Sequence, residues 1–188
     1  MPSKLNRQIE AVAISEINKL LAKFKTRVFN QGKAANGSPI GQYSNKPLYV
    51  SVSKEGSRYK TRIGSQIDNT RLKPRGKAND SPKFKNGKPR KSSYFGGGYK
   101  EFRQAVKRQN GYVDLNLSGQ LFFDVRVFKI RGGFLEIAIQ NRDSIDKARG
   151  NEKRFSKDIF SISEKEAAAT IEKISNIAAD LAVKAFFR

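Results

Sequence analysis

The residues best suited to chemistry in this chain are its lysines and arginines. Residues 31–110 hold 19 Lys or Arg against 4 Asp or Glu, in a chain of 188 residues with a net charge of +21. One run in this stretch is suited to contact a polyanion or an acidic partner, and it comprises Lys83, Lys85, Lys88, Arg90 and Lys91. Its cations could bind DNA phosphates without reading the base sequence, or an acidic protein face. A run of charges can also be a solvated loop that only keeps a protein soluble, and both interpretations stay open.

Four aromatic residues follow the basic run, namely Tyr94, Phe95, Tyr99 and Phe102. The glycine triplet at 96–98 lacks the spacing of a phosphate-binding loop. It predicts a tight bend that lets the four rings converge. The rings either form a local core or anchor the chain against a neighbouring subunit, since aromatic residues are favoured at the centres of protein interfaces.

Catalysis is disfavoured by what the composition lacks. The chain has no histidine and no cysteine. The commonest general base, the usual metal ligands and the Ser–His and Cys–His nucleophile pairs are therefore missing. Asp143 and Asp146 stand among basic neighbours without the spacing of a calcium loop, so they predict ordinary turn chemistry. We expect no enzyme, no cofactor and no metal site, and a nuclease using Asp and Lys is the least favoured alternative.

The chain also lacks the sequence marks of membrane insertion. No apolar run approaches the ~20 residues that a membrane-spanning helix needs. The segment from Met1 to Arg7 has no apolar core of a signal peptide. These features predict a soluble protein made in a cytoplasm, with no membrane partner.

A long amphipathic helix is predicted over residues 5–29. Its apolar stripe consists of Leu5, Ile9, Ala13, Ile17, Leu20, Phe24 and Val28. These positions recur three and four residues apart, as the face of a helix does. Gly32 and the Gly-Ser-Pro cluster at 37–39 end it.

The middle of the chain is predicted to carry little regular structure. Alternating stretches at 48–53 and 58–63 predict a β-hairpin. Residues 64–93 have no periodicity and too few apolar residues to form a core of their own. A short helix is expected over 100–109. We interpret 64–111 as an extended basic insertion, or arm, within one domain.

The last part of the chain predicts strands and a second long helix. The strands are expected at 112–117, 122–130 and 134–140, the last two joined by a hairpin turn at 131–133. A helix over 163–187 follows two overlapping capping-box spacings, Ser161/Glu164 and Ser163/Glu166. The whole chain, 1–188, thus predicts a single α+β domain whose N- and C-terminal helices pack on one antiparallel sheet.

A structural turn is predicted at Gly119, with Leu115 and Leu121 buried on either side. The segment Leu115-Asn-Leu-Ser-Gly-Gln-Leu121 resembles the Leu-x-x-Thr-Gly-x-Leu signature of the virion-morphogenesis and tail-completion (neck) proteins of tailed phages. Arg154-Phe-Ser-Lys-Asp-Ile-Phe-Ser-Ile-Ser-Glu164 is similar to the segment that leads into their C-terminal helix. The loop Asn36-Gly-Ser-Pro-Ile-Gly41 also fits, although Ser118 replaces the usual Thr.

The resemblance implies a structural protein of the virion, assembled in the host cytoplasm. It looks like the versions found in phages of Bacteroidetes, including crAss-like phages. It implies a head–tail connector, neck or tail-completion ring of six- or twelvefold symmetry, in contact with portal or adaptor and tail proteins. Nonspecific contact with DNA in the channel would suit the surplus positive charge. The alternative is a nucleic-acid-binding protein that acts alone.

Overall fold

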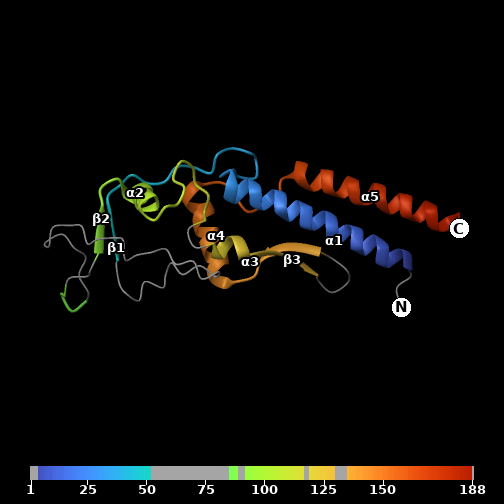
Figure 1. Cartoon of the computed structure of the whole chain (residues 1–188), viewed down its shortest axis with the longest axis horizontal. Coiled ribbons are helices and arrows are strands. Elements are labelled where there is room, and N and C mark those ends of the chain that lie inside the picture. The colour runs from blue at the N-terminus through green and yellow to red at the C-terminus, as the bar shows by residue number, and fades with distance from the viewer. Residues whose placement is uncertain (1–3, 52–84, 89–91, 117–118, 130–134, 188) are drawn as a thin grey trace. The chain divides into compact units, whose positions relative to one another are not determined.

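A computed structural model describes residues 4–51, 85–88, 92–116, 119–129 and 135–187. These residues confirm the predicted α+β class (Figure 1). The chain forms two compact units: the first combines Met1–Ser38 with Leu121–Arg188, and the second is Pro39–Gln120. The described residues of the predicted insertion, 85–88 and 92–111, belong to the second unit.

The first unit begins with α1 (Lys4–Lys25), which follows the predicted apolar stripe. Leu20 and Phe24 are buried on that side. The helix continues into one wider turn of π-helix (Thr26–Asn30) and stops before Gly32. The predicted N-terminal helix is confirmed, with its last turn in a different helical form.

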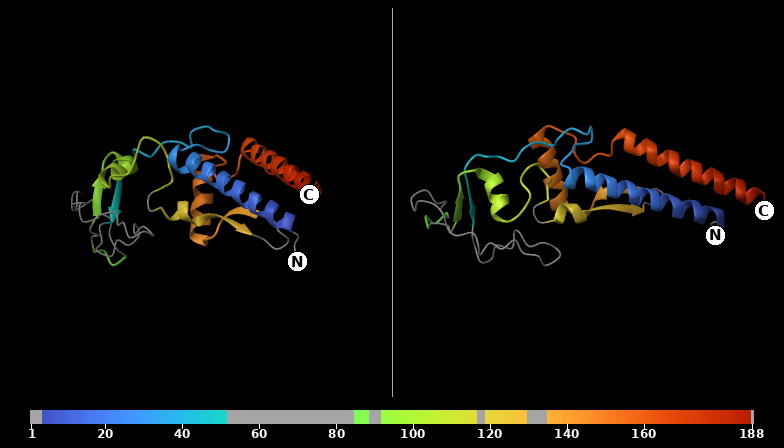
Figure 2. Two further views of the ribbon diagram at one scale, coloured as in Figure 1. Left: turned by 45° about the vertical axis from the view of Figure 1, so that its right-hand side comes forward. Right: turned by 45° about the horizontal axis from the view of Figure 1, so that its top comes forward.

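The second long helix, α5 (Glu164–Phe186), runs antiparallel to α1 and lies along it (Figures 1 and 2). It starts at a capping box, in which the Ser163 hydroxyl accepts a hydrogen bond from the Glu166 N–H at 3.2 Å and the Glu166 carboxylate accepts one from the Ser163 N–H at 3.0 Å. The less exposed residues of α5 recur three or four apart on the side toward α1: Thr170, Ile174, Ala178 and Leu181. The prediction of a helix from Ser163 is confirmed.

The helix α1 lies between α5 and an antiparallel sheet (Figure 2). This sheet pairs β3 (Val125–Lys129) with β4 (Leu135–Ile139), with Val127 opposite Ile137. The sequence predicted both long helices on one sheet. Instead α1 contacts the sheet and α5 packs on α1.

The predicted strand over 134–140 is confirmed, whereas the strand over 122–130 begins later than predicted. A short helix, α3 (Gln120–Asp124), precedes β3 and buries Leu121 and Asp124. The apolar run at this position suited a strand equally well, so periodicity alone did not separate the two. The turn predicted at 131–133 lies outside the described residues.

A helix that the sequence did not predict, α4 (Arg142–Phe155), follows β4 and packs against it. The side chain of Asn141 caps it by accepting a hydrogen bond from the Asp143 N–H at 2.9 Å. Asp143 and Asp146 therefore lie in the first turns of a helix, and the prediction of a simple turn there is wrong.

The second unit pairs β1 (Leu48–Ser51) with β2 (Ser92–Phe95), with Leu48 opposite Phe95. The sequence expected 48–53 to pair with 58–63, and the latter residues lie outside the described part of the chain. Gly96 and Gly97 turn the chain into α2 (Gly98–Ala105), which is shorter than the helix predicted over 100–109.

The strand predicted at 112–117 is wrong over its described residues, 112–116. These residues form no regular structure, and Leu115 has a left-handed backbone with φ of +53°. The side chain of Asp114 is buried in a polar cluster, and this tertiary contact outweighs the alternating pattern.

Candidate functional site

The predicted basic run is described only in part. Lys85 and Lys88 are exposed, on either side of a turn in which the Asn86 side chain accepts a hydrogen bond from the Lys88 N–H at 3.2 Å. Lys83, Arg90 and Lys91 lie outside the described residues. The role of this run in binding a polyanion or a partner stays a prediction.

The predicted aromatic residues divide into two groups. Phe95 and Phe102 are buried and meet edge to face at 5.5 Å, and Tyr99 lies 5.6 Å from Phe102. Phe95 and Phe102 form a hydrophobic cluster with Val50 in the second unit, and Tyr99 packs against it. The sequence left two roles open for these rings, a local core or a subunit anchor. Phe95 and Phe102 have the first role, because they are buried within their own unit.

Tyr94 is in a different position. Successive residues of a strand point to opposite faces, so Tyr94 lies away from Phe95. Its ring pairs with Tyr49 at 5.0 Å and is 36% exposed. Tyr94 is the most exposed member of the predicted set, and its role as a subunit anchor stays a prediction.

Two glycines have the backbone that the predicted turns need. Gly98 has a φ of +70°, and a Cβ there would lie 2.5 Å from the Lys46 carbonyl oxygen and 2.6 Å from that of Ser44. Gly119 has a φ of +79°. Both are in the left-handed region that a side chain disfavours. Of the two leucines around Gly119, Leu121 is buried and Leu115 is half-buried.

A buried ion pair in the second unit had no sequence signal. Arg103 is 1% exposed and donates through Nη2 to Asp114 Oδ2 at 2.9 Å. Its Nε donates to the Gln109 carbonyl at 2.7 Å, and its guanidinium lies 4.5 Å from the centre of the Tyr43 ring. The Tyr43 hydroxyl donates to Asp114 Oδ1 at 2.8 Å. Burial and the Asp114 carboxylate raise the pKa of Tyr43. Every partner is satisfied, so the cluster stabilises the fold and offers no accessible acid or base.

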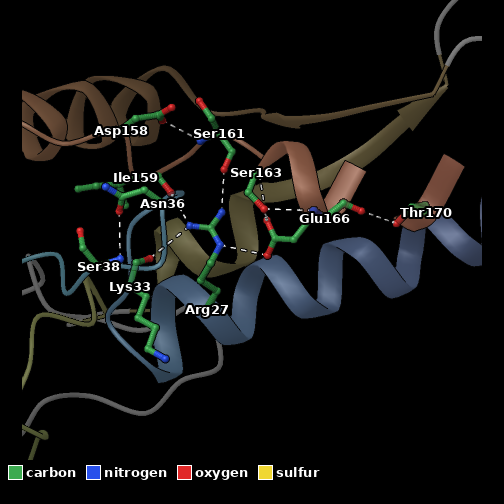
Figure 3. A network of polar contacts seen from close by, with 10 residues as sticks. All are labelled: Arg27, Lys33, Asn36, Ser38, Asp158, Ile159, Ser161, Ser163, Glu166 and Thr170. Atoms are coloured by element: carbon green, nitrogen blue, oxygen red, sulfur yellow. Dashed lines mark hydrogen bonds and ion pairs between the residues drawn. The ribbon is translucent and has the colours of Figure 1, made fainter. Parts of the chain in front are cut away.

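A second arginine, Arg27, ties the first unit together (Figure 3). Its Nε donates to Glu166 Oε1 at 3.1 Å and its Nη2 to the Ser161 carbonyl at 2.7 Å. Nη1 lies 3.3 Å from the carbonyl oxygen of Lys33 and 3.4 Å from that of Ile159. The end of α1 is thereby joined to the segment that leads into α5.

The same network explains the ionisation of Glu166. Burial acts to raise the pKa of this carboxyl group, but hydrogen bonds from Ser163 and the nearby Arg27 outweigh it, so the pKa is lowered. A carboxylate held in its charged form between two donors suits a fixed structural contact rather than proton transfer.

Most of the large apolar residues that are exposed in the described part of the first unit lie on α5 or directly after it. We define the α5 outer face as Ala168, Ile171, Ser175, Ala179, Ala182, Val183 and Phe186. These exposed positions share one side of the helix, and all but the neighbours Ala182 and Val183 follow one another at three or four residues. The exposed polar residues Glu172 and Asn176 lie on the same side. Ile171 is 63% exposed, Val183 56% and Phe186 90%, and Phe187 after the helix is 85% exposed. No residue of α5, all of which the structure describes, is fully buried.

The described residues offer no alternative site for metal chemistry or membrane insertion. Within them, no three His, Cys, Asp or Glu side chains gather in a way that could hold a metal ion. None of the helices in the described part of the chain is long and apolar enough to cross a membrane.

Comparison of the chain with protein-family models, with curated proteins and with solved structures finds no match. The chain's own residues are therefore the basis for a functional assignment.

Proposed function

We propose that this chain is a structural subunit of the head–tail connector of a tailed phage, acting as a neck ring or tail-completion protein without catalytic activity. The observation that carries the proposal is the α5 outer face. The motif resemblance of Leu115–Leu121, and of the segment entering α5, supplies the kind of assembly.

The exposed apolar residues of α5 favour association of the chain with other subunits. Burying a side chain such as Ile, Val or Phe contributes about 2 kcal/mol. Ile171, Val183, Phe186 and Phe187 are mostly exposed in the isolated chain, so this contribution is still unused. Contiguous exposed apolar residues commonly mark a protein interface.

The charge of the chain is consistent with the same role. A net charge of +21 makes random self-association unfavourable, because the chains repel one another. By contrast, α5 holds three lysines against four acidic residues between Glu164 and Phe186. Association through this nearly neutral helix avoids most of the repulsion and leaves the basic residues free to meet DNA or an acidic partner.

Size-exclusion chromatography with light scattering tests the proposal. The parent protein should form an oligomer. The double variant Ile171→Asp/Val183→Asp should be a monomer with unchanged helix content, because charges would be placed on the contact face. The control variant Lys184→Asp also introduces a carboxylate, at an exposed position on the other side of α5, and should stay assembled. A parent protein that is monomeric at every concentration tested would contradict the proposal.

The alternative of a nucleic-acid-binding protein acting alone rests on the 19 Lys or Arg of residues 31–110. It predicts a monomer that binds DNA. A ring subunit should also be encoded beside a portal and tail proteins, which a solitary DNA-binding protein need not be.

A further inference from the structure

We propose that α4 presents a second DNA-binding surface, in the first unit and separate from the basic run of the second unit. We define the α4 basic face as Lys147, Arg149, Lys153 and Arg154, with Gly150 at its centre. The partner is the phosphate backbone of duplex DNA. The proposal does not depend on the neck assignment, because a free subunit would show the same contact.

The charge of the C-terminal part of the first unit is concentrated at this face. Residues 147–157 contain five Lys or Arg and one acidic residue, while the rest of 121–188 contains eight Lys or Arg and nine acidic residues. The single acid, Glu152, is turned inward: its Oε1 accepts hydrogen bonds from the N–H groups of Ile159 at 3.1 Å and Phe160 at 3.0 Å. The exposed charges of α4 from Lys147 onward are therefore all cationic, so the proposed contact uses the C-terminal half of the helix, beyond the exposed acids Asp143 and Asp146 of its first turns.

The packing of α4 sets which side is outward. Ser144 and Ala148 are buried, and the Ser144 hydroxyl donates to Asp124 Oδ2 at 2.6 Å. The residues of the α4 basic face are all exposed. Helical spacing arranges them in two rows on either side of Gly150, with Arg149 and Lys153 in one and Lys147 and Arg154 in the other.

The surroundings of Gly150 give no structural reason for a glycine at this position. It is an exposed glycine inside a helix, where alanine is more favourable, and a Cβ there would meet nothing within 4 Å. Glycine removes the side chain between the two cationic rows. A phosphate backbone can then approach the helix closely while the rows contact it from both sides.

The helix dipole accounts for only part of the pattern. Cations in the last turn of a helix are favoured by the dipole, and Lys153 and Arg154 lie there. Lys147 and Arg149 lie outside that turn, and the dipole gives no reason for Gly150. DNA is favoured over an acidic protein as the partner because it carries a charge every ~1.7 Å. The cations are spaced by about 6 Å along the helix in the Arg149–Lys153 row and by about 10 Å in the Lys147–Arg154 row, so both rows can meet phosphates in many registers.

The test compares variants of equal charge in the full-length protein. Binding to a fluorescent duplex DNA of arbitrary sequence is measured by anisotropy over a range of salt concentrations. Arg149→Gln/Lys153→Gln should weaken binding about tenfold and lower the salt slope by about two. The control Lys165→Gln/Lys184→Gln removes two exposed charges of α5 and should change affinity less than twofold. Because both doubles keep the second unit intact, its own DNA contacts cancel in the comparison.

Gly150→Ala provides a test that leaves charge unchanged. It should raise the melting temperature, because alanine favours the helix, and still weaken DNA binding several-fold. Equal DNA affinities for the two charge doubles would overturn the proposal. Displacement of DNA by poly-glutamate as readily as by unlabelled DNA at equal charge would overturn it in favour of an acidic protein partner. Light scattering of the same samples reports assembly separately, so a failure of the neck assignment would be seen there with DNA binding intact.

Discussion

At the scale of single residues, each unit contains a buried arginine that links several of its own segments. Arg27 and Arg103 each donate several hydrogen bonds from a planar guanidinium, which suits contacts with carbonyls and carboxylates at the same time. Neither is available to a polyanion. The cations that could bind DNA are the exposed ones, so net charge alone does not identify the binding residues.

Asp114→Ala should destabilise the second unit by about 3 kcal/mol, because Arg103 would be left buried without its counter-charge. Thermal unfolding and hydrogen exchange of the amides of α2 would measure the loss. The control Asp180→Ala removes an exposed carboxylate of α5 and should change stability by less than about 0.5 kcal/mol. Equal effects of the two substitutions would mean that water replaces the lost partner of Arg103.

At the scale of elements, the antiparallel pair α1 and α5 is the frame of the first unit. Ile17 and Ile174 are half-buried members of their apolar stripes. Ile17→Asp or Ile174→Asp should each lower the free energy of unfolding by about 3 kcal/mol, because a charge would be placed between packed elements. Chemical denaturation followed by helical circular dichroism would measure it.

The matched controls for that pair are Ser15→Asp on α1 and Asn176→Asp on α5, both at exposed positions. They introduce the same charge outside the contact and should be nearly neutral. If the isoleucine variants are as stable as these controls, the two helices do not depend on each other for stability.

The elements that the sequence predicted are those with strong local signals. The stripe of α1 and the capping box of α5 specify their helices within a few residues. The helix α4 was missed because its apolar residues are few, and its helical form depends on the cap at Asn141 and on burial of Ser144 and Ala148. Such tertiary contributions leave no periodic pattern in the sequence.

Long-range partners were beyond prediction for a related reason. The pairing of β1 with β2 joins residues about 45 positions apart, and local hairpins are the simpler reading of alternating segments. The cluster of Arg103, Asp114 and Tyr43 joins three separate segments, and no regular spacing in the sequence indicates that these residues meet. Of the candidate site, the basic run and the turns at 96–98 and Gly119 were visible in the sequence, whereas the α4 basic face required knowledge that residues 142–155 form a helix.

At the scale of the whole molecule, the chain combines strong positive charge with an apolar C-terminal end. Charge keeps such a chain soluble as a monomer, and exposed aromatic side chains make it prone to associate. Phe186 and Phe187 are 90% and 85% exposed, so they contribute little to the stability of the isolated chain. Their apolar surface is available to a second subunit.

The double variant Phe186→Ser/Phe187→Ser should therefore separate assembly from folding. The melting temperature of the dilute protein should stay within a degree or two of the parent, since surface substitutions change stability by less than about 0.5 kcal/mol. The fraction of oligomer in light scattering should fall, because two aromatic contacts are lost from the interface. Lys184→Ser, at an exposed polar position nearby, serves as the control and should leave assembly unchanged. A large drop in melting temperature with assembly intact would show that the two rings pack within their own chain, and the interface would then have to lie elsewhere.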